Sequence, residues 1–292
     1  MKKLLVGYDG SGPAREAALM AGRLAKQLGA NVTVLTVGEI APLIVAPTGM
    51  FIREAQERDF VPIAEEGAEI VEALGVAAES QVEIGDPATQ VVEAVRRAGV
   101  DLVVMGHRGM GGVAGLVLGS VAKKVAEESS CPVLVVIGNA PDTIRKILVA
   151  IDGSEHSRRA VEIIVDLASA FDAEVTIIHV LDPTELGEAT TEVAKRKLRA
   201  AFRERGSSIL ADAAELFRRA GVAHETVLAE GRPSDVVSER VQSSDYDLVA
   251  IGRRGLGGVK SLMLGSVSDE VLRKVKRPVL LVGERATTSL TT

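Results

Sequence analysis

The chain reads LVVMGHRGMGGVAGLVLGSV over residues 102–121 and LVAIGRRGLGGVKSLMLGSV over residues 248–267. In each stretch an apolar run leads into a glycine, a second glycine follows three positions later, and nine residues separate that glycine from a Gly-Ser pair. Because the same spacing occurs twice, in the same place within each half, the glycines indicate an internal duplication. The chain of 292 residues therefore consists of two related halves.

Both halves open in the same way. An apolar run ends in Asp-Gly-Ser, with Asp9 in the first half and Asp152 in the second, 143 residues later. Helical sequence follows each Asp-Gly-Ser, and Ser11 and Ser154 are predicted to cap these helices. One domain usually takes about 100 to 200 residues, so the repeat predicts two domains, residues 1–140 and residues 141–292.

The middle segments of the two halves differ. Residues 38–60 contain prolines and glycines and predict a loop, whereas residues 185–220 are charged and periodic and predict a helix. The spacing also changes across these segments, because Gly106 and Gly252 are 146 residues apart.

Short apolar runs alternate with helical periodicity along each half, and the runs are apolar throughout their length. This pattern is typical of parallel strands that are buried on both faces. The sequence predicts an α/β protein of two tandem doubly wound, Rossmann-like domains. Each domain is expected to hold a five-stranded, mainly parallel sheet with helices on both faces.

Doubly wound domains bind ligands beyond the carboxyl ends of their strands. Three segments reach that edge in each half: the Asp-Gly-Ser turn, the end of the second strand and the first glycine of the repeated motif. Glycines let backbone N–H groups approach an anion, and the Gly-Ser pair opens a helix whose N-terminus favours phosphate. The alternative, that the glycines only form turns and the serines only cap helices, explains one copy better than two matched copies.

Two other phosphate motifs fit the sequence less well. No glycine is followed by lysine, so the P-loop pattern is absent. Residues 109–114 satisfy the dinucleotide pattern G-x-G-x-x-A, but Lys260 takes the closing position in the second half. The motif also follows a fourth strand and not a first one, which disfavours a dinucleotide site.

Composition excludes several classes of partner. The net charge is -6 and only 2% of residues are aromatic, so the basic surface and stacking platforms of nucleic-acid binders are not expected. No apolar run is long enough to span a membrane, and we expect a cytoplasmic protein without a membrane partner. Cys131 is the only cysteine and is predicted to be buried.

The motifs resemble those of the universal stress protein family, in the tandem form of its ATP-binding branch. The resemblance rests on G-2x-G-9x-G-[S/T] in both halves, on Asp-Gly-Ser, on the valine that closes the second strand, and on the Pro-Val-Leu that starts the last strand. It covers nearly the whole chain, apart from the divergent middle segments and the last residues.

The resemblance implies one adenine-nucleotide site in each domain. The ligand would be ATP, with ADP or AMP as alternatives, together with Mg²⁺, although the metal ligands are unknown. The aspartates would lie near the ribose or the metal-phosphate end, the valines against adenine, and the glycine motif along ribose and phosphates. The expected binding residues are Asp9, Val37, Met105, Gly106, Gly109, Gly119, Ser120, Val121, Asp152, Val180, Ile251, Gly252, Gly255, Gly265, Ser266 and Val267.

The resemblance also implies assembly through the last strands. Family members dimerise by pairing these strands, and here residues 133–137 and 279–282 could pair within one chain as an intramolecular pseudo-dimer. A further homodimer remains open, and so does the identity of a protein partner.

Three functions stay open at this point. The favoured one is an ATP-binding regulator of the stress response that senses ATP or changes its partner binding with the nucleotide. The second is a slow ATPase or an autophosphorylating protein, with Ser120 or Ser266 as acceptor. The third is a scaffold with empty sites. No residue is an evident catalytic base; the loop candidates for stabilising phosphoryl charge are His107, Arg108, Arg253 and Arg254.

Charges beside the two sites differ. Lys123 and Lys124 of the first half match Asp269 and Glu270 of the second. From this charge difference, the first site is expected to bind a polyphosphate more tightly than the second.

Overall fold

The structure is a computed structural model that describes residues 1–38, 49–109, 118–186, 191–255 and 263–283. The chain divides into two compact units, with the boundary between Asp142 and Thr143.

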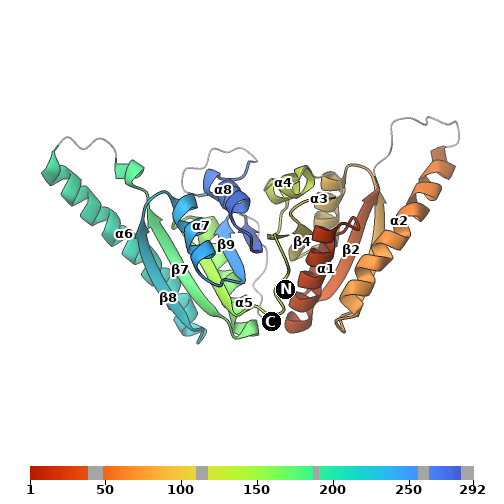
Figure 1. The fold of residues 1–292 in the computed structure, drawn as a ribbon, viewed down its shortest axis with the longest axis horizontal. Helices are drawn as coiled ribbons and strands as arrows, with labels where there is room; N and C mark the ends of the chain where they lie inside the picture. The colour runs from red at the N-terminus through yellow and green to blue at the C-terminus, as the bar shows by residue number, and fades with distance from the viewer. Residues whose placement is uncertain (39–48, 110–117, 187–190, 256–262, 284–292) are drawn as a thin grey trace. The chain divides into compact units, whose positions relative to one another are not determined.

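The first domain alternates strands and helices along its length (Figure 1). Its elements are β1 (Lys3–Gly7), α1 (Gly12–Leu28), β2 (Asn31–Gly38), α2 (Gly49–Glu72), β3 (Ala78–Ile84), α3 (Pro87–Ala98), β4 (Leu102–Gly106), α4 (Ser120–Glu128) and β5 (Val133–Val136).

The second domain repeats this order, with one short 3-10 helix, η1, added after its second strand. Its elements are β6 (Lys146–Ala150), α5 (Glu155–Phe171), β7 (Glu174–Leu181), η1 (Pro183–Leu186), α6 (Glu192–Arg219), β8 (His224–Glu230), α7 (Pro233–Ser243), β9 (Leu248–Gly252), α8 (Ser266–Lys274) and β10 (Val279–Val282).

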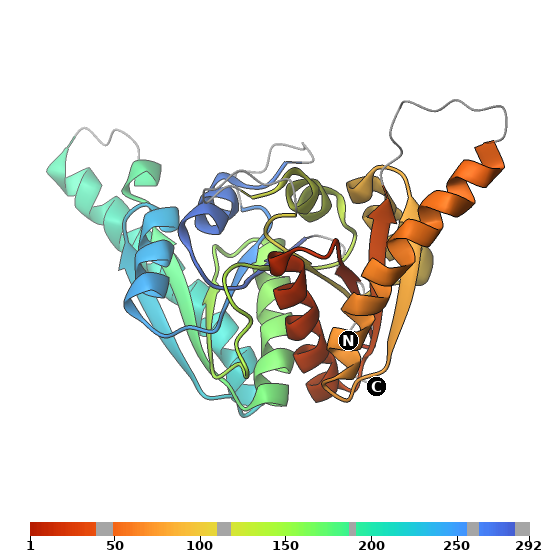
Figure 2. The same cartoon turned by 45° about the vertical axis from the view of Figure 1, so that its right-hand side comes forward.

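Strand order within each domain confirms the doubly wound prediction. The described strands of the first domain lie in the order β3-β2-β1-β4-β5 and those of the second in the order β8-β7-β6-β9-β10, with parallel pairs inside each domain. The order reverses at β1 and β6, so right-handed crossovers place the first two helices and the last two helices on opposite faces. Figures 1 and 2 show α1 beside α2, and these two helices pack together, as do α3 and α4.

Four strands are buried along their whole length, because helices cover both faces of each sheet. All residues of β4, β5, β9 and β10 are buried, which explains why these runs are apolar without alternation. The prediction for Cys131 is confirmed, since this thiol lies buried before β5.

The predicted helix caps are confirmed in both domains. The side chain of Ser11 accepts a hydrogen bond from the backbone N–H of Ala14 at 3.3 Å, and the side chain of Ser154 accepts one from Ser157 at 3.2 Å. Pro13 lies in the first turn of α1, where a missing N–H costs nothing. These caps fix where the first helix of each domain leaves the ligand edge of the sheet.

The loop predicted over residues 38–60 is wrong for most of its length. Gly38 still belongs to β2, and helix α2 begins at Gly49 and runs to Glu72, while residues 39–48 lie outside the described part. The prolines that suggested a loop precede the helix, and Pro62 lies inside it. Packing of α2 against α1, β2 and β3 outweighs the local preference of these residues.

Candidate functional site

The carboxylates of Asp9 and Asp152 are held in the same way, just beyond β1 and β6. The backbone N–H of Ser11 donates to Asp9 Oδ1 at 3.0 Å, and that of Ser154 donates to Asp152 Oδ1 at 2.9 Å. One oxygen of each carboxylate is therefore fixed by the turn, and this fixes the direction of the other.

The second oxygen of each carboxylate lies against the glycine motif. A Cβ placed on Gly255 would lie 2.5 Å from Asp152 Oδ2, and a Cβ on Gly109 would collide with Asp9 Oδ2 in the same way. The space of the missing side chain is thus occupied by the carboxylate. Glycine at these positions is explained by this close approach, and the two segments meet in both domains.

A backbone hydrogen bond closes the glycine loop of each domain. The N–H of Gly119 donates to the carbonyl of His107 at 2.8 Å, and the N–H of Gly265 donates to that of Arg253 at 2.9 Å. Both glycines are N-caps without a capping side chain, for α4 and α8 respectively. The helix N-termini that begin at the serines are therefore suited to an anionic group.

A cavity of about 590 Å³ opens at this edge of the second domain. Small-molecule sites generally have volumes of about 300–1,000 Å³. All of the residues predicted for this domain line the cavity: Asp152, Val180, Ile251, Gly252, Gly255, Gly265, Ser266 and Val267. The structure thus brings together residues from the ends of three strands and the start of α8.

The first domain places its predicted residues at matched positions: Asp9 after β1, Val37 in β2, Met105 and Gly106 at the end of β4, Gly109 in the loop, Gly119 before α4, and Ser120 and Val121 in its first turn. Gly106 lies against the start of α1, where a Cβ would be 2.6 Å from the carbonyl carbon of Pro13. The remainder of the G-x-G-x-x-A pattern, residues 110–114, and its counterpart at residues 256–260 lie outside the described part of the chain.

The contribution of α6 to the second cavity is not evident from the sequence. Phe202, Arg205 and Ile209 of this helix line the cavity. Ile209 reaches it over Gly153, where a Cβ would lie 2.9 Å from Ile209 Cδ1. Helical periodicity predicts α6, but no local pattern shows that this helix packs beside the strand ends.

The space between the second strand and the helix that follows it is filled by different rings in the two domains. In the first domain the ring of Phe60, on α2, takes the space beside Gly38, where a Cβ would collide with it. In the second domain the ring belongs to His179 of β7, and Gly206 of α6 leaves room for it, since a Cβ there would lie 2.8 Å from the imidazole. The imidazole Nδ1 hydrogen-bonds the carbonyl of Ile151 at 2.7 Å.

The model of the universal stress protein family matches residues 1–136 and again residues 143–283. The chain belongs to the universal stress protein family. It carries two universal stress protein domains in tandem, which together account for nearly all of its length.

Similar proteins include both tandem and single-domain forms. A universal stress protein of Mycolicibacterium smegmatis is 30% identical over 304 residues, which cover 97% of each chain. A universal stress protein of Thermus aquaticus is 38% identical over 142 residues, covering 47% of this chain and 98% of its own. The crystal structure of a universal stress protein from Archaeoglobus fulgidus matches with a TM-score of 0.70 at 23% identity over 96% of each chain, which shows the fold.

The loop side chains of the first universal stress protein domain are engaged with each other. Arg108 Nε donates to His107 Nε2 at 3.0 Å, and His107 Nδ1 lies 3.3 Å from the carbonyl of Val136. Burial, with Arg108 beside it, lowers the pKa of His107. His107 is therefore neutral at pH 7, and both of its ring nitrogens are engaged. It is not available as a general acid.

In the second domain the loop arginines differ from each other. Arg254 lines the cavity and donates from Nε to the carbonyl of Met263 at 3.2 Å. Arg253 lies against Gly283 at the end of β10, where a Cβ would overlap its guanidinium. Of the two, Arg254 is the one placed to meet a ligand.

The charges beside each site form ion pairs whose signs are reversed between the domains. Lys124 of α4 donates to Asp86 at 2.9 Å in the first domain. At the matched positions of the second domain, Glu270 of α8 is paired with Arg232. Lys124 and Glu270 are thus each neutralised by a partner, so the expected advantage of the first site from Lys124 cancels.

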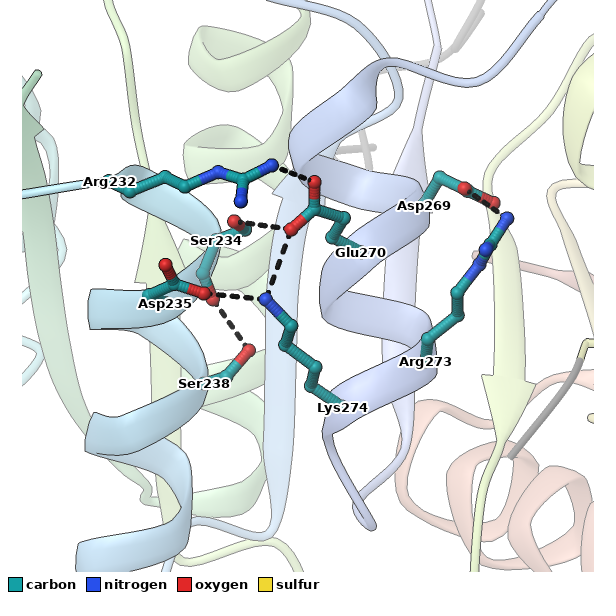
Figure 3. A network of polar contacts seen from close by, with 8 residues as sticks. All are labelled: Arg232, Ser234, Asp235, Ser238, Asp269, Glu270, Arg273 and Lys274. Atoms are coloured by element: carbon teal, nitrogen blue, oxygen red, sulfur yellow. Dashed lines mark hydrogen bonds and ion pairs between the residues drawn. The ribbon is translucent and has the colours of Figure 1, made fainter. Parts of the chain in front are cut away.

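Glu270 also belongs to a wider network in the second domain (Figure 3). It accepts from the hydroxyl of Ser234 at 2.8 Å and from Lys274 at 3.0 Å, and Lys274 donates to Asp235 at 2.5 Å. Arg232, Ser234 and Glu270 all line the cavity. The network therefore fixes the start of α7 beside α8 at the cavity wall.

Asp86 is predicted to stabilise the first domain in a pH-dependent way. Its carboxylate accepts from Lys124 and caps α3 at the N–H of Thr89, 2.9 Å away, and these bonds lower its pKa from 3.8 to about 2. Asp86→Ala should therefore cost about 1 kcal/mol of unfolding free energy at pH 7. Because the folded-state pKa is the lower one, this contribution is present above pH 3.8 and is lost as the pH falls through about 2.

Unfolding measured at several pH values for the wild type and for Asp86→Ala tests this prediction. Asp86→Asn is the matched control, because it keeps an oxygen for the Thr89 N–H and should lose less. A difference between wild type and Asp86→Ala that stays constant down to pH 2 would contradict the assigned role.

No helix in the described ranges is long and apolar enough to cross a membrane. Among the same residues, no group of three or more His, Cys, Asp or Glu side chains is arranged to hold a metal ion.

Proposed function

We propose that this universal stress protein is an ATP-binding regulator with one adenine-nucleotide site in each domain. The observation that carries the proposal is the cavity at the carboxyl edge of the second sheet, which is lined by the Asp152 turn, the end of β7 and both ends of the glycine motif. The first domain repeats the contacts between the aspartate and the glycine loop.

The phosphates would lie at the start of α8. Gly265 offers backbone without a side chain, Ser266 is the first helical residue, and the N-terminus has no capping side chain. Such a terminus supplies N–H donors and the positive end of the helix dipole. Ser120 and Gly119 would do the same in the first domain.

The nucleoside would lie over the ends of β6, β7 and β9. Val180 and Ile251 give the cavity aliphatic walls, and Asp152 carries its carboxylate beside them. A carboxylate can accept from ribose hydroxyls or join the phosphates in holding Mg²⁺. Asp152 thus fits either end of the expected ligand, and Mg²⁺ would neutralise phosphate charge.

Binding is favoured over rapid turnover. Hydrolysis needs a group that orients water and charges that stabilise the transferring phosphoryl. Among the described loop residues, Arg254 is the cation that lines the cavity, and His107 is engaged with Arg108 and Val136. A slow ATPase or autophosphorylation at Ser120 or Ser266 is the second candidate, because both serines begin helices at the proposed phosphate position.

Mass spectrometry of small molecules released by denaturing the full-length protein, followed by titration with Mg-ATP, tests the proposal. We expect an adenine nucleotide on the purified protein and two binding sites per chain. Steady phosphate release, or a phosphate on Ser120 or Ser266, would favour the enzyme. Protein without nucleotide that also fails to bind ATP, ADP or AMP would favour an empty scaffold and contradict the proposal.

We further propose that the two domains form an intramolecular pseudo-dimer through β5 and β10. Each is an apolar strand that pairs with one neighbour inside its own domain, and an apolar edge favours further pairing. Light scattering should then give the mass of one chain or of a dimer of chains. Proteolysis between the domains that releases two separate, folded pieces would count against this pairing.

A further inference from the structure

The two sites can be compared residue by residue because α2 and α6 are anchored in the same way. Ile63 of α2 lies over Gly10, where a Cβ would be 3.6 Å from its Cγ2. Ile209 of α6 lies over Gly153 in the same position after β6, and it follows Ile63 by 146 residues. One helical turn before these isoleucines stand Asp59 and Arg205.

Arg205 brings an uncompensated positive charge to the second cavity. It lines the cavity, its side chain is exposed, and it makes no hydrogen bond or ion pair with any described residue. Arg232, in contrast, lines the same cavity but is paired with Glu270. Arg254 also lines the cavity, but the first domain has Arg108 at the matched position. Arg205 is therefore the unpaired cation that distinguishes the second cavity.

The matched position of the first domain carries the opposite charge, since Asp59 is an acid. At the other reversed position that lines the second cavity the charges cancel, because Lys124 pairs with Asp86 and Glu270 pairs with Arg232. Asp269, the counterpart of Lys123, does not line the cavity. Among the described positions of the cavity lining, what remains is a difference of two charge units, an acid at residue 59 against an arginine at residue 205. Polyphosphates are attracted by the second arrangement and repelled by the first.

We propose that Arg205 is a further recognition residue of the second-domain site, and that this domain holds an anionic nucleotide more tightly than the first. The inference rests on the proposed function, since it orders the affinities of the two proposed sites. Arg205 acts through its charge on the ligand's phosphates. Its effect should grow from AMP to ATP and be absent for adenosine.

Calorimetric titration of full-length protein with Mg-ATP tests the order of the sites. The second site is measured in Gly109→Ala protein and the first in Gly255→Ala protein, since each change is expected to disable only its own domain. We expect ATP to bind the second site about tenfold more tightly at low salt, with the difference shrinking at high salt. Equal affinities, or a tighter first site, would overturn the proposal.

Charge exchange at the two matched positions tests the assigned residue. Arg205→Asp should weaken ATP binding by the second site about tenfold and leave adenosine binding unchanged, and Asp59→Arg should strengthen ATP binding by the first site. Arg196→Asp is the control, because Arg196 is an exposed arginine of the same helix that does not line the cavity.

The outcomes separate this inference from the proposed function. Equal losses in Arg205→Asp and Arg196→Asp, or an equal loss for adenosine, would overturn the role of Arg205. If both domains bind ATP but with the same affinity, the proposed function stands and the inference fails. If neither domain binds any nucleotide, the proposed function itself fails.

Discussion

Gly255→Ala is expected to weaken nucleotide binding by the second domain about 10- to 100-fold, because overpacking costs about 1–3 kcal/mol. The new methyl group would lie 2.5 Å from Asp152 Oδ2, while Oδ1 is held by the N–H of Ser154. The carboxylate must therefore leave its place in the site. Gly255 has no positive φ that would strain alanine, so the domain should stay folded.

Calorimetric titration with Mg-ATP measures the effect on each site. The first domain serves as an internal control, because Gly255→Ala should leave its binding unchanged while Gly109→Ala should show the reverse pattern. Gly12→Ala is a second control, since a Cβ there meets nothing within 4 Å.

A double substitution tests whether the methyl group acts by displacing the Asp152 carboxylate. If the methyl group acts only by displacing the carboxylate, Asp152→Ala combined with Gly255→Ala should bind no worse than Asp152→Ala alone. Wild-type affinity in Gly255→Ala, or fully additive losses in the double variant, would contradict the mechanism.

Gly106→Ala is expected to destabilise the first domain by about 3 kcal/mol, at the upper end of overpacking costs. Its Cβ would lie 2.6 Å from the carbonyl carbon and 2.7 Å from the carbonyl oxygen of Pro13. These are backbone atoms at the capped start of α1, so they cannot move aside as a side chain can. The strand β4 or the helix must shift.

Gly252→Ala in the second domain is the matched comparison. Its nearest contacts are 3.0 Å to His156 Cβ and 3.1 Å to the N of Ser157, so we expect a loss of about 1 kcal/mol. Hydrogen exchange by mass spectrometry reports each domain separately, through peptides that cover β4 and β9. If Gly106→Ala accelerates hydrogen exchange in the first domain no more than Gly252→Ala does in the second, the closer contact with Pro13 does not matter.

Much of the fold could be predicted from local sequence. The buried strands are apolar throughout, and the helices that follow Asp9 and Asp152 have serine caps. Because the sequence is repeated, the elements predicted in one half can be checked against those of the other. The failure at residues 49–60 has a physical cause, because Gly49 and the preceding Pro42 and Pro47 indicate local breaks, whereas contacts of α2 with the sheet decide the structure.

The site could be predicted in part. Its glycines, serines and aspartates are found by spacing, because backbone geometry and helix termini impose that spacing. Phe202, Arg205 and Ile209 are not, since they reach the cavity only through the packing of α6 over Gly153. The effect of Lys124 and Glu270 could not be judged either, because the sequence does not show which residues neutralise them.

The reversed ion pairs have a consequence for how a duplicated chain folds. Two copies of one architecture offer α4 and α8 similar places to dock, and an exchange between halves is a hazard of tandem chains. An exchanged α8 would bring Glu270 beside Asp86, and an exchanged α4 would bring Lys124 beside Arg232. Both exchanges would bring like charges together, so electrostatic repulsion favours the docking of each helix in its own domain.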